Sequence, residues 1–220
     1  MSIPYGKHNI SKKDIKNVVR VLKSDWLTQG KAIPKFEQAL CKYTGSMYAT
    51  VVNSATSALH VACKALGLKK GSILWTVPNT FVSSANCGLH CGAKVDFVDI
   101  NYDTKNISIS ELERKLEVSK KEGSLPDAVV PVAFAGLSCD MQKINFLSKK
   151  YNFKIIEDAS HALGANYKEL PVGSCNWSDV TVFSFHPVKI ITSGEGGVAM
   201  TNDLNLNKKM KLLRTHGITK

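Results

Sequence analysis

From Thr50 onward, short apolar runs alternate with longer amphipathic segments, and this alternation restricts the possible folds more than any other feature of the chain. Runs rich in β-branched and aromatic residues predict strands at Thr50–Val52, Ile73–Val77, Lys94–Ile100, Ala128–Ala133, Phe153–Glu157, Val180–Phe185 and Val198–Thr201. Segments between most of these runs predict helices at Thr56–Leu66, Val82–Cys91, Ser110–Lys121 and Asp140–Tyr151. Strands that alternate with helices form a mostly parallel sheet covered by helices, so we expect an α/β fold.

The first 50 residues predict helices rather than strands. A capping box and an apolar stripe indicate a first helix: Ser11, Asp14, Ile15, Val18, Val19 and Leu22. A second helix, between Pro34 and Gly45, is expected to bury a stripe formed by Phe36, Ala39, Leu40 and Tyr43. We therefore predict an N-terminal helical segment, residues 1–50, and one larger domain, residues 51–220.

The bulk properties are those of a water-soluble α/β protein. With 220 residues, of which 44% are hydrophobic, the chain can bury a sizeable core. No apolar run approaches the roughly 20 residues of a membrane span, and the first 16 residues are too polar for a secretory signal. We therefore expect a cytoplasmic protein that does not enter a membrane.

The net charge of +11 raises the question of nucleic-acid binding. The lysines are scattered along the chain, however, and no basic block is interleaved with aromatic residues. A solvated basic surface explains this pattern better than a nucleic-acid site does. The positive field would also assist capture of an anionic small molecule.

The six cysteines show no paired C-x-x-C spacing. Cys87 and Cys91 can share one face of a helix, but the sequence supplies no second pair of ligands for a zinc ion. Buried free thiols are therefore predicted, and no metal site. This cysteine usage fits a reducing cytoplasm.

Two charged residues follow predicted strands. Asp158 comes directly after Phe153–Glu157, and Lys189 comes shortly after Val180–Phe185. In an open α/β sheet, ligands bind beyond the carboxyl ends of the strands. A lysine and a carboxylate at that edge suit pyridoxal phosphate, which needs a lysine to form a Schiff base and an acid to keep its pyridine nitrogen protonated. From the residues alone, Asp158 also fits a helix cap or a turn residue, and Lys189 also fits a surface lysine.

Two further segments are rich in small residues, one before a predicted helix and one after the Lys189 segment. Asn53–Ser57 precedes a helical run, and small polar residues at a helix start leave backbone N–H groups free for a phosphate. An ordinary N-cap is the alternative, since serine and threonine are common caps. Gly194, Gly196 and Gly197 predict a tight turn.

Several of these segments also resemble a known family. The strings E-D-A-S-H-A from Glu157, F-S-F-H-P-x-K from Phe183 and G-E-G-G from Gly194 are similar to those of the DegT/DnrJ/EryC1/StrS sugar aminotransferases. The resemblance includes L-T-Q-G at 27–30, N-S-A-T-S-A-L-H at 53–60, W-T-x-P-x-T-F at 75–81 and R-x-H-G-I-T at 214–219. It implies the large domain of a fold-type-I pyridoxal-phosphate enzyme. Family members continue into a smaller C-terminal domain, so we expect this chain to be the cofactor-binding portion of a longer, homodimeric protein.

The resemblance also implies a role for individual residues. Lys189 is the expected catalytic residue and covalent cofactor attachment. The remaining expected cofactor-binding residues are Ala55, Thr56 and Ser184 at the phosphate, Phe81 stacked on the ring, Asp158 at the pyridine nitrogen and His161 near the phenolic oxygen. The expected nucleotide-sugar contacts are Tyr5, Asp25, Trp26, Leu27 and Thr28. The alternatives are a structural histidine for His161, a core position for Phe81 and simple packing for the N-terminal residues.

The function implied by the resemblance is transamination of a UDP-linked 4-keto-6-deoxy sugar, with L-glutamate as the amino donor. Some relatives carry histidine at the position of Lys189 and catalyse dehydration, so the lysine favours transamination. Two alternatives are a different sugar specificity and a non-catalytic fragment that binds the cofactor or a partner.

Overall fold

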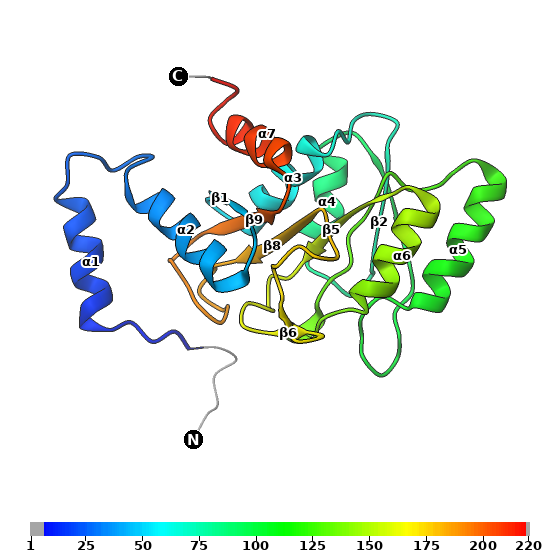
Figure 1. Ribbon diagram of the computed structural model, residues 1–220, viewed down its shortest axis with the longest axis horizontal. Coiled ribbons are helices and arrows are strands. Elements are labelled where there is room, and N and C mark those ends of the chain that lie inside the picture. Colours follow the sequence, from blue (N-terminus) through cyan, green and yellow to red (C-terminus); the bar gives the residue numbers. More distant parts are fainter. Residues whose placement is uncertain (1–6, 219–220) are drawn as a thin grey trace.

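The computed structural model describes residues 7–218, and its centre is a seven-stranded, mostly parallel sheet with helices on both faces (Figure 1). The strands are β1 (Tyr48–Val52), β2 (Ile73–Thr76), β3 (Lys94–Phe97), β4 (Ala128–Val129), β5 (Lys154–Asp158), β8 (Val180–Ser184) and β9 (Gly197–Thr201). Their order is β1-β9-β8-β5-β4-β2-β3. Only β9 runs antiparallel to its neighbours in this sheet. The predicted α/β fold is confirmed, and each predicted strand is present with shifted ends; β4 is reduced to two residues.

One face of the sheet is covered by three helices, α3 (Ala55–Ala65), α4 (Ser83–Leu89) and α7 (Leu204–Arg214). Leu59 and Met210 pack from this layer against Val182 of the sheet, and all three side chains are buried. Successive strand residues point to opposite faces, so Val182 faces α3 while its neighbour Phe183 faces the other way. Burial of each such side chain contributes about 1.5–3 kcal/mol.

The opposite face carries α2 (Ala32–Thr44), α5 (Ile109–Glu122) and α6 (Met141–Tyr151). A short hairpin, β6 (Asn166–Tyr167) and β7 (Leu170–Pro171), lies beside them, and a 3₁₀ turn, η1 (Phe134–Gly136), follows β4. Leu116 and Ile144 bury their side chains against Trp75 under α5 and α6. Leu40 of α2 packs in a separate cluster with Phe183. The predicted division of the chain at residue 50 stays a prediction, but α2 shares this core with the larger domain.

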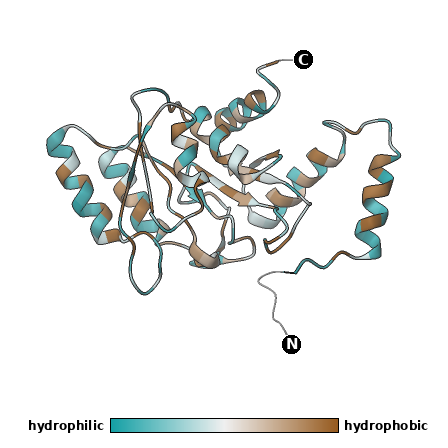
Figure 2. Cartoon of the chain, turned by 180° about the vertical axis from the view of Figure 1, so that it is seen from behind, coloured by the Kyte–Doolittle hydropathy of each residue, from teal (hydrophilic) through white to brown (hydrophobic). Residues whose placement is uncertain are grey.

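The first helix, α1 (Lys12–Leu22), stands beside the rest of the protein (Figure 2). The predicted capping box is present, because the Asp14 backbone N–H donates to the Ser11 hydroxyl and the Ser11 backbone N–H donates back to the Asp14 carboxylate. No residue of α1 is buried, and the apolar stripe that includes Ile15, Val18 and Leu22 is exposed. Local capping and periodicity therefore define this helix without a covering surface.

The buried face of α2 differs from the prediction. Leu40 is buried and Phe36 is half-buried, but Ala39 and Tyr43 are exposed. Glu37 is buried in their place. Its carboxylate accepts hydrogen bonds from the Arg214 guanidinium at 2.7 Å and from the Val51 backbone N–H at 3.0 Å. An apolar stripe could not reveal this burial, because it depends on a charge partner 177 residues away.

The cysteines are unpaired in the described part of the chain, as predicted. Cys63, Cys87, Cys91 and Cys139 are buried, whereas Cys41 and Cys175 are partly accessible. Within residues 7–218, no group of histidine, cysteine and acidic side chains is arranged to hold a metal ion. No helix over the same range has both the length and the apolar character needed to cross a bilayer.

Candidate active site

A cavity of about 720 Å³ opens at the carboxyl ends of β5 and β8, beside the N-termini of α3 and α4. This volume lies within the range of small-molecule sites, roughly 300–1,000 Å³. The residues predicted to bind the cofactor all line it: Ala55, Thr56, Phe81, Asp158, His161, Ser184 and Lys189. The fold thus brings together residues separated by up to 134 positions in the sequence, from Ala55 to Lys189.

Lys189 faces His161 across the cavity wall. Its Nζ lies 2.6 Å from Nε2 of His161. An ammonium group can only donate, so Nε2 accepts this hydrogen bond and the histidine carries its proton on Nδ1. Desolvation lowers the pKa of Lys189, although the charge of Asp158 opposes this shift. Desolvation, and then the charge of Lys189, lowers the pKa of His161. Both shifts favour the neutral form of each group, which is the form that acts as a base.

Asp158 ends β5 and is only 4% exposed. Its Oδ2 accepts a hydrogen bond from the Ser84 hydroxyl at 2.6 Å. Its Oδ1 accepts from the Ser160 hydroxyl at 2.6 Å and from the Ser160 backbone N–H at 3.2 Å. A buried carboxylate held by these donors is oriented toward the cavity, so the helix-cap interpretation of Asp158 does not describe this environment.

The N-terminus of α3 forms another wall of the cavity. Ser54 caps the helix, since its hydroxyl accepts a hydrogen bond from the Ser57 N–H at 3.1 Å. The backbone N–H groups of Ala55 and Thr56 lie in the first turn, where a helix offers them no acceptor. Thr56 is linked to Ser83 of α4 by hydroxyls 2.7 Å apart. Free N–H groups and the helix dipole make this end of α3 suited to bind an anion.

Gly197 brings β9 against that helix end. A Cβ atom at this position would lie 2.3 Å from the carbonyl carbon of Ser54 and 2.4 Å from the nitrogen of Ala55. The tight turn predicted for the glycine cluster holds for Gly194, which has a φ of 84°. It is wrong for Gly197, which begins β9. Here glycine is required by close backbone approach rather than by chain reversal.

Phe81 lies at the rim of the cavity and is 73% exposed. A core side chain would be covered, so the core interpretation of Phe81 is wrong. Beside it, Asn79 donates from Nδ2 to the Lys105 carbonyl at 2.8 Å, while its buried Oδ1 has no hydrogen-bond partner among the described residues. An accessible ring and an unused acceptor are both suited to contact a bound molecule.

The predicted nucleotide-sugar contacts that fall within the described residues are not at the cavity. Asp25, Trp26, Leu27 and Thr28 lie between α1 and α2, are exposed and do not line its wall. Tyr5 lies outside the described residues. These assignments stay predictions.

The sequence analysis also overlooked residues of the site, which are Asn79, Thr80, Ser83, Ser84, Ser160, His186 and Glu195. Ser160 stands within the E-D-A-S-H-A string and had a local signal. Ser84 had none, since its partner Asp158 is 74 positions away.

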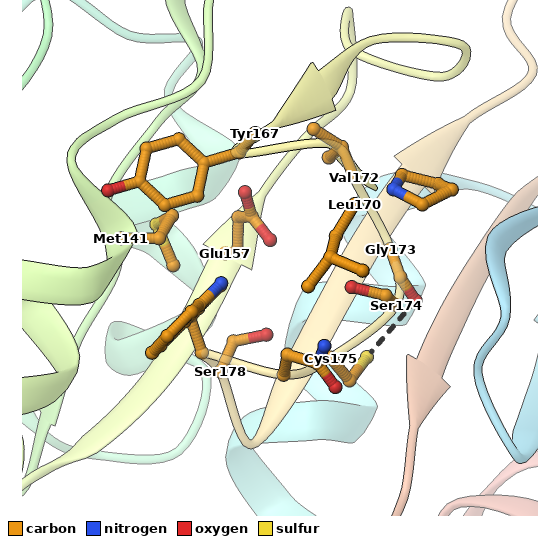
Figure 3. A pocket seen from close by; sticks show the side chains of 12 residues that line it. Met141, Glu157, Tyr167, Leu170, Val172, Gly173, Ser174, Cys175 and Ser178 are labelled. Carbon is orange, nitrogen blue, oxygen red and sulfur yellow. Dashed lines mark hydrogen bonds between the residues drawn. The ribbon is translucent and has the colours of Figure 1, made fainter.

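A second hollow surrounds Glu157 on the opposite face of β5 (Figure 3). Its volume is about 10 Å³, enough for one water molecule at most. Burial, followed by the charge of Asp158, raises the pKa of Glu157 to about 7, and a hydrogen bond from Thr181 opposes the shift. This hollow is too small for a substrate and lies away from Lys189.

The residues of the larger cavity fit pyridoxal phosphate. The N-terminus of α3, which a Cβ at Gly197 would close off, complements the phosphate. The Asp158 carboxylate, held by serine hydroxyls, complements the ring nitrogen, and the desolvated Lys189 complements the aldehyde. The accessible Phe81 ring adds a stacking surface.

Comparison with known proteins places the chain in a family of aminotransferases. The model of the DegT/DnrJ/EryC1/StrS aminotransferase family matches residues 8–220. A UDP-4-amino-4,6-dideoxy-N-acetyl-beta-L-altrosamine transaminase of Campylobacter jejuni is 48% identical over 218 residues, which are 99% of this chain and 56% of that protein. The spore coat polysaccharide biosynthesis protein SpsC of Bacillus subtilis is 38% identical, over 99% of this chain and 54% of SpsC.

Solved structures agree with the sequence relatives. Helicobacter pylori PseC, described as an aminotransferase involved in the biosynthesis of pseudoaminic acid, superposes with a TM-score of 0.90 at 38% identity, over 99% of this chain and 57% of PseC. The PLP-form of Spr1654 from Streptococcus pneumoniae, a putative sugar aminotransferase by its description, gives a TM-score of 0.88 at 30% identity, over 100% of this chain and 59% of Spr1654. The chain therefore spans a little over half the length of these relatives.

Proposed function

The chain belongs to the DegT/DnrJ/EryC1/StrS aminotransferase family, and on that premise we propose that it carries the catalytic centre of a sugar aminotransferase. Pyridoxal phosphate is the cofactor of this family, and one structural relative was solved in its PLP-form. The proposed reaction moves an amino group from L-glutamate to the C4 carbonyl of a UDP-linked 4-keto-6-deoxy sugar.

One observation carries this proposal: Lys189, Asp158 and the first turn of α3 meet in a single cavity. The three groups line the same wall and differ in charge: an amine, a carboxylate and the positive end of a helix dipole. A basic amine, an acid and a phosphate-binding helix end are the set that pyridoxal phosphate requires. Neither the charge of the chain nor its fold alone would distinguish this site from other α/β ligand sites.

Each residue has a defined task in the proposed reaction. When bound, the cofactor supplies an electron sink for the carbon that exchanges its proton. Ala55 and Thr56 would hold the phosphate, and Asp158 would hold the protonated ring nitrogen. Lys189 attaches the cofactor and, once released, moves protons through Nζ. Nε2 of His161 accepts a hydrogen bond from that amine at 2.6 Å, which leaves the lone pair of Nζ free to point into the site.

The choice of sugar follows the relatives. The C. jejuni protein is named for a UDP-linked amino-dideoxy sugar and PseC for pseudoaminic acid biosynthesis, which supports a UDP-4-keto sugar of the pseudaminic acid type for this chain. The positive net charge of +11 favours an anionic nucleotide-sugar. Action in the cytoplasm, suggested by the free thiols, and a homodimer at the relatives' full length are parts of the same proposal.

An assay of the purified protein with L-glutamate and a panel of UDP-4-keto sugars tests the proposal. Formation of 2-oxoglutarate together with a UDP-amino sugar is the expected result. Turnover of a different sugar, or loss of water without gain of nitrogen, would correct the substrate or the reaction class. Binding of the cofactor with no turnover of any sugar would contradict the proposed activity.

A further inference from the structure

Asp158 is held by a hydroxyl from another part of the fold as well as by its neighbour Ser160. The Ser84 hydroxyl, on α4, reaches Oδ2 at 2.6 Å across 74 positions of sequence. Ser84 is 0% exposed and does not line the cavity. It therefore contacts Asp158 from behind the wall, where no ligand competes for the same hydrogen bond.

The hydroxyl of Thr80 extends this contact by one step. Its Oγ1 lies 2.8 Å from Oγ of Ser84, and the geometry permits either atom to be the donor. Chemistry settles the direction, because an ionised carboxylate only accepts hydrogen bonds. Ser84 has a single hydroxyl proton and gives it to Asp158, so Thr80 must donate to Ser84. Thr80, Ser84 and Asp158 thus form a chain whose donors all point toward the carboxylate.

Such a chain has an electrostatic consequence. A buried negative charge is stable only when donors satisfy it, and hydrogen bonds to charged groups are worth roughly twice those between neutral groups. Polarisation along consecutive hydroxyls strengthens the last bond of the chain. The Asp158 side chain is also kept from rotating, because its two oxygens are tied to α4 by Ser84 and to its own loop by Ser160.

We propose that Ser84 is a positioning residue that fixes the Asp158 carboxylate against the protonated ring nitrogen of the cofactor, with Thr80 orienting the Ser84 hydroxyl. This inference rests on the proposed function, since it assigns Asp158 to that nitrogen. Ser84 acts through Asp158 and touches neither cofactor nor substrate in this proposal.

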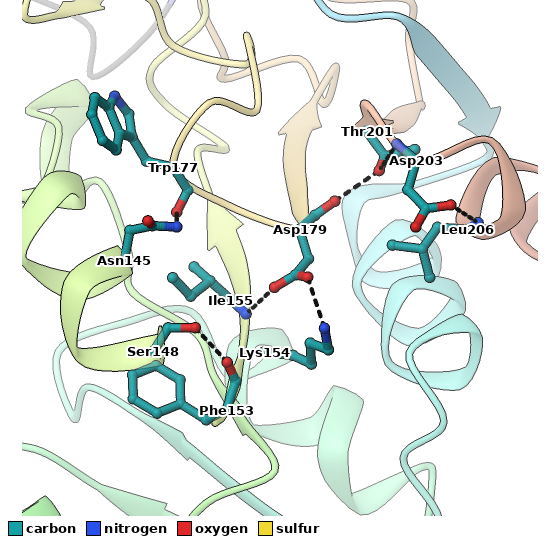
Figure 4. A network of polar contacts seen from close by, with 10 residues as sticks. All are labelled: Asn145, Ser148, Phe153, Lys154, Ile155, Trp177, Asp179, Thr201, Asp203 and Leu206. Carbon is teal, nitrogen blue, oxygen red and sulfur yellow. Dashed lines mark hydrogen bonds and ion pairs between the residues drawn. The ribbon is translucent and has the colours of Figure 1, made fainter. Parts of the chain in front are cut away.

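A purely structural role is the competing explanation, in which Ser84 only fastens α4 to the sheet. Ser148 provides a matched control, because its hydroxyl on α6 donates to the Phe153 carbonyl just before β5 (Figure 4). Both serines bond to residues at an end of the same strand, and only Ser84 bonds to the residue at the cavity. Ser148→Ala therefore reports the loss of stability without the loss of positioning.

The test measures the cofactor itself. Pyridoxal phosphate labelled with ¹⁵N in the ring is bound to each variant, and the nitrogen resonance reports its protonation. In Ser84→Ala the resonance is expected to move toward that of neutral pyridine, with cofactor affinity reduced roughly tenfold, the equivalent of one hydrogen bond to a charged group. Thr80→Val should produce a smaller shift in the same direction, and Thr80→Ser, which keeps the donor, should match the wild type. Ser148→Ala should leave the resonance unchanged.

The outcomes separate the two proposals. If Ser84→Ala and Thr80→Val keep the wild-type resonance and affinity while Ser84→Ala loses stability like Ser148→Ala, Ser84 is structural and this inference is wrong, with the proposed function intact. Wild-type protein that holds no cofactor would overturn both. Should Ser84→Ala fail to fold, the Thr80→Val and Thr80→Ser pair decides by the same resonance.

Discussion

Two aspartates lie at opposite edges of the sheet, Asp179 just before β8 and Asp158 at the end of β5. The same residue type supports the structure at one edge and faces the candidate active site at the other. Asp179 lies just before β8, at the amino-terminal edge (Figure 4). Its carboxylate accepts hydrogen bonds from the Ile155 backbone N–H at 2.8 Å and the Lys154 ammonium at 3.3 Å. Asp158 lies at the opposite end of β5, where Ser84 and Ser160 hold its carboxylate.

The neighbouring contacts differ in the same way. Around Asp179, side chains bond mainly to the backbone: Thr201 donates to the Asp179 carbonyl at 2.8 Å, and Asn145 donates to the Trp177 carbonyl at 3.1 Å. At the cavity, side chains bond mainly to one another, as Thr56 does with Ser83 and Lys189 with His161. Side chain–side chain bonds make up only about 10–15% of the hydrogen bonds in folded proteins.

Contacts of these two kinds have different roles in the fold. A hydrogen bond from a side chain to the backbone stabilises a strand or helix end, and its loss lowers the free energy of unfolding. Bonds among side chains around a cavity fix the direction of groups that the fold itself does not need. The following predictions test whether the two edges separate in this way.

The largest difference is expected between two lysines. Lys189→Ala should abolish the adduct formed when the cofactor-loaded protein is reduced with borohydride, because the amine that attaches the cofactor is removed. Lys154→Ala, at the Asp179 edge, should retain the adduct. Mass spectrometry of the reduced peptides measures both. An undiminished adduct on another lysine would end the assignment of Lys189.

The two aspartates provide the next comparison. Asp158→Asn should keep some cofactor but lower kcat by about 100- to 1,000-fold, since the amide lacks the charge that stabilises the protonated ring nitrogen. The measurement is steady-state turnover in a protein of the relatives' full length, with Asp179→Asn as the control. A kcat for Asp158→Asn close to that of the wild type would show that the carboxylate has no electrostatic role.

Glu157 lies on the other face of β5 from the cavity, and its burial should make the free energy of unfolding depend on pH. Burial raises the pKa of Glu157 from its usual 4.5 to about 7, so the folded state binds the proton more tightly than the unfolded state. Its contribution to stability is complete below pH 4.5 and is lost as the pH rises through 7. Glu157→Gln should therefore flatten the decline in the free energy of unfolding between about pH 5 and pH 8, by about 2 kcal/mol.

Urea unfolding at several pH values measures this effect. Parallel pH profiles for the wild type and Glu157→Gln would show that the buried acid does not titrate in this range. Glu122→Gln, at the solvent-exposed end of α5, is the matched control and should leave the profile unchanged.

The smallest expected effect lies at the structural edge. Asp179→Asn should lower the free energy of unfolding by about 1 kcal/mol, because it weakens a charge-assisted bond to the Ile155 N–H. Cofactor affinity, followed by absorbance, should remain that of the wild type. A change in affinity comparable to that of Asp158→Asn would mean that the two edges are coupled, and the distinction drawn above would fail.

The sequence predicted the sheet and the helices that cover it, because apolar periodicity is local information. It did not predict α7, whose segment contains Asn205, Lys208 and Lys209 and buries only Asn207 and Met210. It also predicted burial for Ala39 and Tyr43, where the ion pair of Glu37 with Arg214 turns another side of α2 toward the core. Periodicity cannot record a charge partner that arrives from the far end of the chain.

The site shows the same limit. Asp158 ends β5 and Lys189 comes shortly after β8, and strand ends can be read from sequence. Ser84 is one of several serines in the chain, and its contact with Asp158 exists only after α4 has packed on the sheet. The need for glycine at position 197 is likewise visible only when β9 lies against α3.

The position of β9 has a consequence for how the protein is made. β1 pairs with β9 along its whole length, from Tyr48 opposite Thr201 to Val52 opposite Gly197, and it is an edge strand with no second partner in this sheet. A ribosome adding about 5–20 residues per second needs roughly 7–30 s to reach β9 after completing β1. During that interval β1, which leads into the N-terminus of α3, has no strand to pair with. β1 is the first strand of this sheet to be synthesised, and it therefore gains its partner only after β9, the last strand of the sheet, has emerged.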